Sequence, residues 1–129
     1  MADSAYSEVS AHDRSALARM VMQAFDHWDL ETDGALEMLG HAPSDEGLIS
    51  RYREGEPLPD EADVLDRAGH ILGIHKDLRL LFPHDRAKAY RWVKTRNRAF
   101  DGCTPVEVVS REGLQGLLRV RSYLERVVA

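Results

Sequence analysis

The first clear pattern along the chain is an apolar stripe of helical period between residues 17 and 28. Apolar side chains recur there at spacings of three and four residues, as they do where one face of an α-helix is buried. The positions are Leu17, Met20, Val21, Ala24, Phe25 and Trp28. We therefore predict a first helix whose core face carries these six side chains.

Two shorter helices are predicted in the rest of the first half. Thr32 should cap one of them and Gly40 should end it, because hydroxyl side chains favour the N-cap and glycine favours the residue after a helix. After a tight turn, Ser44 should cap another, which Gly55 should end. Their apolar positions are Ala35, Leu36, Leu39, Leu48, Ile49 and Tyr52.

The second half is also patterned as helices. One should follow Pro59, with a kink or break possible at Gly69 and Gly73, another should begin at Pro83, and the last should begin near Gly113. Their core positions include Val64, Ala68, Ile71, Leu78, Ala89, Val93, Leu117, Leu118 and Leu124. Because no segment alternates with period two for long enough to form a strand, the sequence predicts an all-α fold.

Charge divides the chain more sharply than its net value of -5 suggests. Residues 1–65 contain 15 Asp or Glu and 4 Arg or Lys, a formal charge of -11, whereas residues 66–129 contain 7 and 13, a formal charge of +6. Charge asymmetry of this kind bears on association rather than on fold. We therefore expect the two halves to face different partners.

Length and composition limit the class of protein. A chain of 129 residues, 43% of them hydrophobic, suits one compact domain or two small units that share a core. It has no apolar run long enough for a membrane span, and its polar start lacks the features of a secretory signal. A single cysteine, Cys103, cannot form an internal disulfide, which fits a reducing compartment. A cytoplasmic protein is expected.

The most informative stretch is the corner between residues 92 and 105. Asn97 and Gly102 favour a turn, so the helix that contains Trp92 should end before Gly102. Thr104 is a good N-cap, Pro105 suits the first helical position, and Glu107 stands where a capping box needs it, so a new helix should begin there. Phe100 should pack with Trp92 beneath the turn.

This corner, written W-x4-N-x2-F-x-G-x-T-P, resembles the C-terminal toxin-binding domain of the Xre/MbcA/ParS family of bacterial antitoxins. The motif residues are Trp92, Asn97, Phe100, Gly102, Thr104 and Pro105. The helical segments on either side, from Leu72 to Trp92 and from Gly113 to Leu124, resemble the same family. The resemblance is strong over residues 60–129 and weak over residues 15–58. It implies a helix-turn-helix-like three-helix unit over residues 1–58, packed on a helical toxin-binding domain over residues 59–129.

The resemblance also implies a partner. Members of this family neutralise a RES-domain toxin, an enzyme that degrades NAD, by covering its active-site entrance with their C-terminal region. By this analogy the helix from Leu114 to Ala129 would meet the toxin, whereas Leu117, Leu118 and Leu124 would belong to the core. The expected toxin-binding residues are Arg119, Arg121, Tyr123, Arg126, Val127 and Val128, together with the terminal carboxylate. A homodimer or a hetero-oligomer with the toxin is expected.

Operator DNA is a second possible partner. The segment from Gly34 to Gly55 has the length of a helix-turn-helix, with Ser44 to Arg53 as its recognition helix. The acidic Asp45 and Glu46 in the first turn of that helix would repel a duplex, which leaves few DNA-binding candidates. These are Ser44, Arg51, Tyr52 and Arg53. The alternatives to an antitoxin are therefore a DNA-binding transcriptional regulator and a standalone adaptor that uses the same domain to oligomerise.

Nothing in the sequence predicts catalysis or a cofactor. The six histidines show neither an H-E-x-x-H motif nor a Cys/His ligand spacing, so no metal site is expected. Cys103 precedes a helix start, but no histidine is near it in sequence, and a structural or incidental role is expected. The six cations between Arg86 and Arg98 indicate a solvated face that suits a protein partner better than nucleic acid. A non-enzymatic binder is predicted.

Overall fold

The computed structural model describes residues 9–45 and 47–128, and every regular element among them is helical. The all-α prediction is therefore confirmed. The α-helices are α1 (Ala11–His27), α2 (Thr32–Met38), α3 (Gly47–Arg53), α4 (Ala62–Leu81), α5 (Arg86–Arg91), α6 (Pro105–Glu112) and α7 (Leu114–Val128). Three short 3-10 turns join them: η2 (Pro43–Asp45), η3 (Trp92–Lys94) and η4 (Arg98–Phe100).

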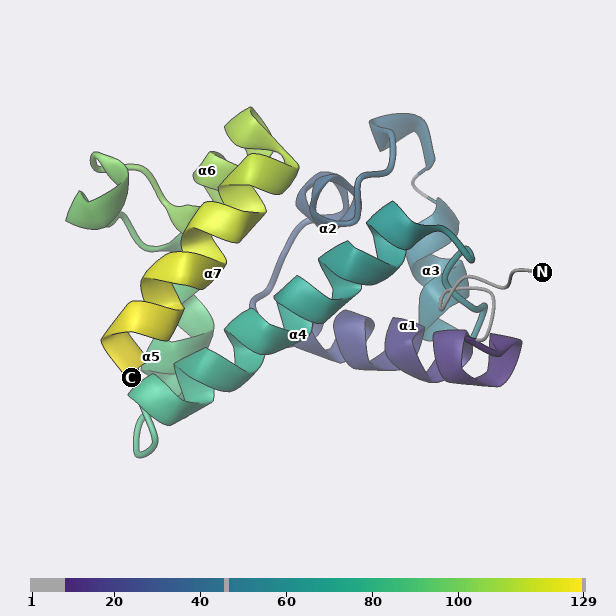
Figure 1. Ribbon diagram of the computed structural model, residues 1–129, viewed down its shortest axis with the longest axis horizontal. Coiled ribbons are helices and arrows are strands. Elements are labelled where there is room, and N and C mark those ends of the chain that lie inside the picture. Colours follow the sequence, from purple (N-terminus) through teal and green to yellow (C-terminus); the bar gives the residue numbers. More distant parts are fainter. Residues whose placement is uncertain (1–8, 46, 129) are drawn as a thin grey trace.

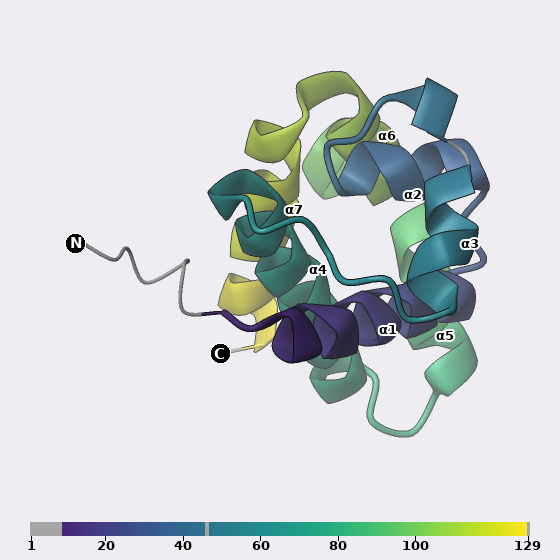
Figure 2. The ribbon, with the colours of Figure 1, turned by 90° about the vertical axis from the view of Figure 1, so that its right-hand side faces the viewer.

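Helix α4 is the central element of the fold. It runs diagonally through the molecule, with α1 and α3 on one side and α2, α5, α6 and α7 on the other (Figure 1). It packs against α1 on the first side and most extensively against α7 on the second. Figure 2 shows α2 close to α6, and these two helices make the other large contact between the halves.

One continuous core runs through both halves. It contains Phe25 and Leu36 from the first half, Leu117 from the second, and Ile71 of α4 between them. Leu58, at the predicted boundary, is itself completely buried. The division into residues 1–58 and 59–129 stays a prediction, and the two regions share their hydrophobic interior.

Helix α1 buries a slightly different face from the one predicted. Val21, Ala24, Phe25 and Trp28 are buried as expected, but Met20 is 50% exposed. Ala18 and Met22 take its place in the core. Successive helical residues are rotated by about 100°, so a stripe centred between Val21 and Phe25 leaves Met20 at its edge. In α7, similarly, Leu118 is only partly buried, whereas Val120 is buried.

Several predicted helix starts are wrong. Helix α2 begins at Thr32 itself, with Glu31 at the N-cap and no side-chain cap. Ser44 lies within η2, and α3 begins only at Gly47. Helix α5 begins at Arg86 rather than Pro83, because the Asp85 carboxylate accepts a hydrogen bond from the Lys88 N–H at 3.1 Å. Thr32 is thus the first residue of its helix rather than the cap, and the other two helices begin later than predicted.

Two predicted helix ends are confirmed. Gly40 and Gly55 follow α2 and α3 with φ values of 79° and 107°, a conformation that favours glycine. Helix α4 continues through Gly69 and Gly73, so the possible break is absent from it. Its continuity allows one rigid helix to hold both halves of the molecule.

Candidate partner-binding surface

The corner between α5 and α6 is organised by Asn97. Its side-chain oxygen accepts a hydrogen bond from the Ala99 N–H at 2.9 Å. Its backbone N–H donates to the Cys103 carbonyl at 3.1 Å, and its backbone carbonyl accepts from the Gly102 N–H at 3.0 Å. Asp101 and Gly102 both have positive φ, at 57° and 84°. The chain therefore turns tightly here, as the sequence predicted.

The start of α6 is fixed by a complete capping box. Thr104 Oγ1 accepts the Glu107 N–H at 3.1 Å, and the Glu107 carboxylate accepts the Thr104 N–H at 2.8 Å. Pro105 occupies the first turn, so the prediction for this helix is confirmed. The hydrogen bond from the Thr104 backbone lowers the pKa of Glu107, which favours the charged form that the cap needs.

Three aromatic side chains join this corner to α7. The ring centroids of Trp92 and Phe100 lie 6.3 Å apart, edge to face, which confirms the predicted packing. Tyr123 of α7 completes the group, 5.3 Å from Phe100 and 6.2 Å from Trp92. Phe100 is buried, while Trp92 and Tyr123 are half-buried. This aromatic cluster fixes α7 against the corner, so the outer face of α7 is presented by a rigid support.

Arg119 lies on the same side of α7 and already has partners within the chain. Its guanidinium is 2.8 Å from the Glu112 carboxylate and 3.9 Å from that of Asp101, and it lies over the Phe100 ring at 5.5 Å. Its side chain is 41% exposed, so these pairs remain accessible to solvent. A partner carboxylate would have to share Arg119 with Glu112.

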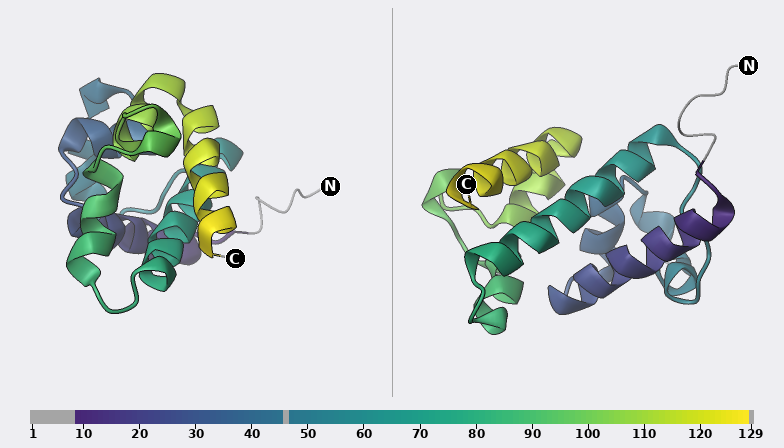
Figure 3. Two further views of the ribbon diagram at one scale, coloured as in Figure 1. Left: turned by 90° about the vertical axis from the view of Figure 1, so that its left-hand side faces the viewer. Right: turned by 60° about the horizontal axis from the view of Figure 1, so that its bottom comes forward.

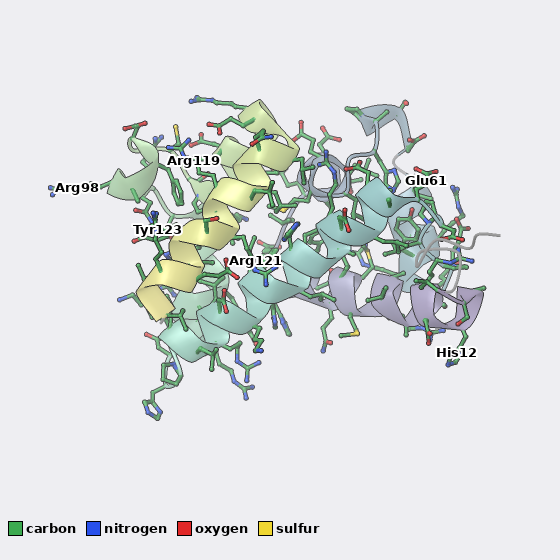
Figure 4. The ribbon with its side chains drawn as sticks, viewed as in Figure 1. His12, Glu61, Arg98, Arg119, Arg121 and Tyr123 are labelled. Carbon is green, nitrogen blue, oxygen red and sulfur yellow. The ribbon has the colours of Figure 1, made fainter. Side chains whose placement is uncertain are left out.

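Arg121 occupies the interface between α7 and α4 (Figure 4). It lies 3.1 Å from a ring nitrogen of His70 on α4 and 3.6 Å from the carboxylate of Glu125 on its own helix. Gly73 makes room for it, because a Cβ at that position would lie 2.6 Å from Arg121 Nε and closer still to Cζ. Arg121 therefore contributes to the placement of α7 on α4.

The last turn of α7 is the most open part of the predicted toxin-binding set. Arg126 is exposed, Val127 is 43% exposed, and Val128 is partly buried. Ala129, with the terminal carboxylate, lies outside the described residues. The structure thus divides the six predicted residues into a group with contacts inside the chain (Arg119, Arg121, Tyr123) and a less enclosed group in the last turn (Arg126, Val127, Val128).

The predicted DNA-binding residues are brought to α3 and its preceding turn, but not to one cationic surface. Tyr52 is completely buried and lies 2.9 Å from a ring nitrogen of His41, so its side chain cannot reach a duplex in this conformation. Arg51 pairs with Glu56 at 3.0 Å and Arg53 pairs with Asp26 at 2.6 Å. Ser44 is exposed in η2, and Glu46 lies outside the described residues.

Comparison with known proteins identifies the second half of the chain. Residues 77–127 match the family described as the antitoxin Xre/MbcA/ParS C-terminal toxin-binding domain. The chain belongs to the Xre/MbcA/ParS antitoxin family. It is also 33% identical over 100 residues to a protein of Sinorhizobium fredii (strain NBRC 101917 / NGR234) named uncharacterized protein y4oB, an overlap that covers 78% of this chain and 74% of that relative.

The family match confirms the resemblance read from the corner motif. It extends from the last turns of α4 through the aromatic cluster to Val127 and so includes every motif residue from Trp92 to Pro105. An antitoxin role, with a toxin as partner, follows from membership of the family. Helix α3 and its DNA-binding candidates lie outside the matched residues.

One cluster in this antitoxin-family protein was not predicted from the sequence. His27 Nδ1 lies 2.9 Å from His75 Nε2, and Tyr90 stacks on His27 with a centroid separation of 4.3 Å. The three residues come from α1, α4 and α5, so no local spacing could have revealed them. Burial, followed by the neighbouring His27 and Arg79, lowers the pKa of His75, which favours the neutral form of that side chain.

Two kinds of feature are absent from residues 9–45 and 47–128. No group of three or more His, Cys, Asp or Glu side chains there could hold a metal ion. No helix in that part of the chain is long and apolar enough to cross a membrane.

Proposed function

We propose that this protein is the antitoxin of a type II toxin–antitoxin pair and that it binds and inhibits a RES-domain toxin that degrades NAD. The C-terminal end of α7 would cover the entrance to the active site of the toxin. The observation that carries this proposal is the exposed last turn of α7, at the end of a domain matched as toxin-binding. The protein acts by binding rather than by catalysis.

The support for α7 favours a plug of this kind. Tyr123 is stacked on Trp92, and Arg121 is seated over Gly73, so the helix is fixed on two sides before its last turn. A plug that is already ordered loses little conformational entropy when it enters a pocket. Arg126, Val127 and Val128 then supply a cation and two apolar side chains to the toxin.

The other predicted contacts take a different role in this proposal. Arg119 and Arg121 have carboxylate partners within the chain at 2.8 Å and 3.6 Å. Charges paired in this way at the rim of an interface influence the rate of encounter and the choice of partner more than the affinity. In this proposal Arg119 and Tyr123 therefore lie at the rim of the interface with the toxin, and Arg121 positions α7.

The test is co-purification with the RES-domain protein encoded in the adjacent reading frame, followed by measurement of NAD loss. Wild-type protein should form a stable complex and suppress NAD loss, whereas deletion of residues 126–129 should abolish suppression without unfolding the chain. The double substitution Arg51→Glu, Arg53→Glu, on α3 in the other half of the molecule, is the control and should suppress as well as wild type. If the truncated protein still suppresses NAD loss, the proposal that the C-terminal end of α7 covers the active site of the toxin is wrong.

Operator binding is the second candidate, with weaker support. Both arginines of α3 are paired with carboxylates, in a half of the chain whose formal charge is -11. The pairs are exposed, so phosphate groups could compete for the arginines, and a dimer would present them twice. Sequence-specific binding to the upstream DNA that disappears in the Arg51→Glu, Arg53→Glu variant would support autoregulation. Retention of binding in that variant would exclude α3 as the reading helix.

The standalone-adaptor alternative makes a different prediction. An adaptor that uses this domain to oligomerise would form a defined oligomer alone and would bind no RES-domain protein. Sedimentation of the protein with and without the toxin separates the two cases.

A further inference from the structure

A hollow of about 310 Å³ lies between the end of α1 and the segment formed by α5 and η3. Figures 2 and 3 show the end of α1 beside α5, although the two helices are far apart in the sequence. His27 and Trp28 line the hollow from the first side, and Tyr90, Arg91 and Lys94 line it from the second. Both halves of the chain therefore build it, and none of its lining residues belongs to α7.

Two aromatic side chains that line the hollow are stacked on each other. The ring centroids of His27 and Tyr90 are 4.3 Å apart, and their planes differ by 10°. His27 is fixed in turn by His75, whose Nε2 lies 2.9 Å from His27 Nδ1. The aromatic lining is therefore held in place by contacts within the chain, and it suits a ligand with a flat ring.

Trp28 contributes a hydrogen-bond donor that has no protein partner. Its side chain is 2% exposed, and its Nε1–H has no acceptor in the part of the chain that the structure describes. Buried donors are nearly always paired, because an unpaired one loses its hydrogen bonds to water without replacement. An oxygen atom of a molecule bound in the hollow would supply the acceptor that this indole lacks.

Two cations lie at the same hollow. Lys94 Nζ donates to the Asp29 carbonyl at 2.8 Å, which leaves further N–H groups of its ammonium for a ligand. Arg91 is exposed and has no ion pair or side-chain hydrogen bond with any described residue. The one lining carboxylate, that of Asp29, is 98% exposed and lies 3.7 Å from Lys94, so water screens it. The hollow therefore favours an anion.

We propose that this hollow binds a small aromatic carboxylate of one or two rings. The ring packs against the aromatic lining, and the carboxylate is held by Arg91, Lys94 and the indole N–H of Trp28. Small-molecule sites have volumes of about 300–1,000 Å³, so a hollow at the lower end suits such an acid better than a dinucleotide. An inorganic anion would leave the aromatic lining uncovered. This site goes beyond the proposed antitoxin function and does not depend on it.

The test is a titration of the purified protein with benzoate and with 2-naphthoate, followed by NMR. The chain has two tryptophans, so the indole N–H of Trp28 gives one of two such signals. Both acids should shift this signal saturably, because their oxygens supply its acceptor. The neutral amides of the same two acids should bind at least about tenfold more weakly, because hydrogen bonds to a charged group are the stronger ones.

Arg91→Gln and Arg86→Gln form a matched pair of variants. Both arginines are exposed on α5, but only Arg91 lines the hollow. Arg91→Gln should weaken the binding of 2-naphthoate about tenfold, as expected for the loss of one charge-assisted hydrogen bond. Arg86→Gln should bind within about twofold of wild type. Thermal unfolding of each variant shows that it remains folded.

Three results would overturn the site. The first is no saturable shift of the Trp28 signal with either acid at about 10 mM, a concentration that would reveal even millimolar affinity. The second is equal weakening by the two variants, which would mean that the acid responds to overall charge and not to this hollow. The third is an equal shift with inorganic phosphate, which would mean that the hollow takes an anion without a ring. The toxin is absent from all these measurements, so their failure leaves the antitoxin function untouched.

Discussion

Replacing Gly116 with alanine should loosen the contact between α6 and α7. Gly116 is buried in α7, and an ideal Cβ there would lie 2.9 Å from the carbonyl carbon of Val108 and closer still to its oxygen. Ordinary van der Waals contact begins at 3.4 Å, so the two helices would have to separate by at least about 0.5 Å. Because the obstacle is backbone, no side-chain rotation can relieve it.

The expected magnitude follows from two opposing effects. Overpacking of a core costs about 1–3 kcal/mol, and a backbone obstacle places this site near the upper end. Alanine gains about 1 kcal/mol over glycine in a helix interior. The free energy of unfolding should therefore fall by about 2 kcal/mol, which corresponds to a melting temperature lower by roughly 6–10 °C for a chain of this size.

Gly69→Ala is the matched control. Gly69 lies within α4, it is exposed, and a Cβ there would meet nothing within 4 Å. The same substitution should raise the free energy of unfolding by about 1 kcal/mol, because only the helix preference changes. Thermal and urea unfolding, followed by circular dichroism, measure both variants. A Gly116→Ala protein as stable as wild type would refute the close approach of α7 to α6.

Three further predictions concern stability. Burial lowers the pKa of His75, so below its ordinary pKa the unfolded chain binds more protons than the folded chain. The contribution of His75 to the free energy of unfolding should therefore be complete above pH 6.5 and be lost as the pH falls through the lowered pKa. Urea unfolding from pH 8 to 5 should show this decline in the free energy of unfolding, and the decline should be smaller in His75→Gln. Thr104→Ala removes the cap of α6 and should cost about 1 kcal/mol in the same unfolding assay, whereas Thr104→Ser should be near wild type. Burial raises the pKa of Tyr52 to about 12, so its contribution to the free energy of unfolding should be complete below pH 10 and be lost above it. Tyr52→Phe should remove this loss of stability at alkaline pH, and it should cost about 1 kcal/mol at neutral pH because the hydrogen bond to His41 is lost.

The features that the sequence predicted correctly are local. The turn around Asn97 and the capping box of Thr104 depend on neighbours within a few residues, and both are present. The same holds for the glycine stops at Gly40 and Gly55. Such features are readable because the hydrogen bonds that form them close within one turn of chain.

The errors arise where distant parts of the chain decide the outcome. Met20 and Leu118 fit a helical stripe, but the partners that cover that stripe leave each of them at its edge. Arg53 was a DNA-binding candidate by its position, and its pairing with Asp26 joins residues 27 positions apart. The cluster of His27, His75 and Tyr90 likewise joins three helices, and single-sequence spacing carries no information about such contacts.

The candidate site was predictable in outline only. The corner motif identified the family and directed attention to α7, and the match over residues 77–127 confirms that part. The sequence did not distinguish Arg121, which is seated on α4, from Arg126, which is open. That distinction depends on Gly73, a residue 48 positions before Arg121 whose missing side chain matters only when α4 and α7 are packed.

The central claim is that the last turn of α7 inhibits a RES-domain toxin. The most direct measurement is the rate of NAD loss catalysed by that toxin as this protein is titrated into the reaction. Our account predicts that wild-type protein suppresses the rate stoichiometrically and that protein lacking residues 126–129 leaves it unchanged. An unchanged rate at saturating wild-type protein would contradict the account.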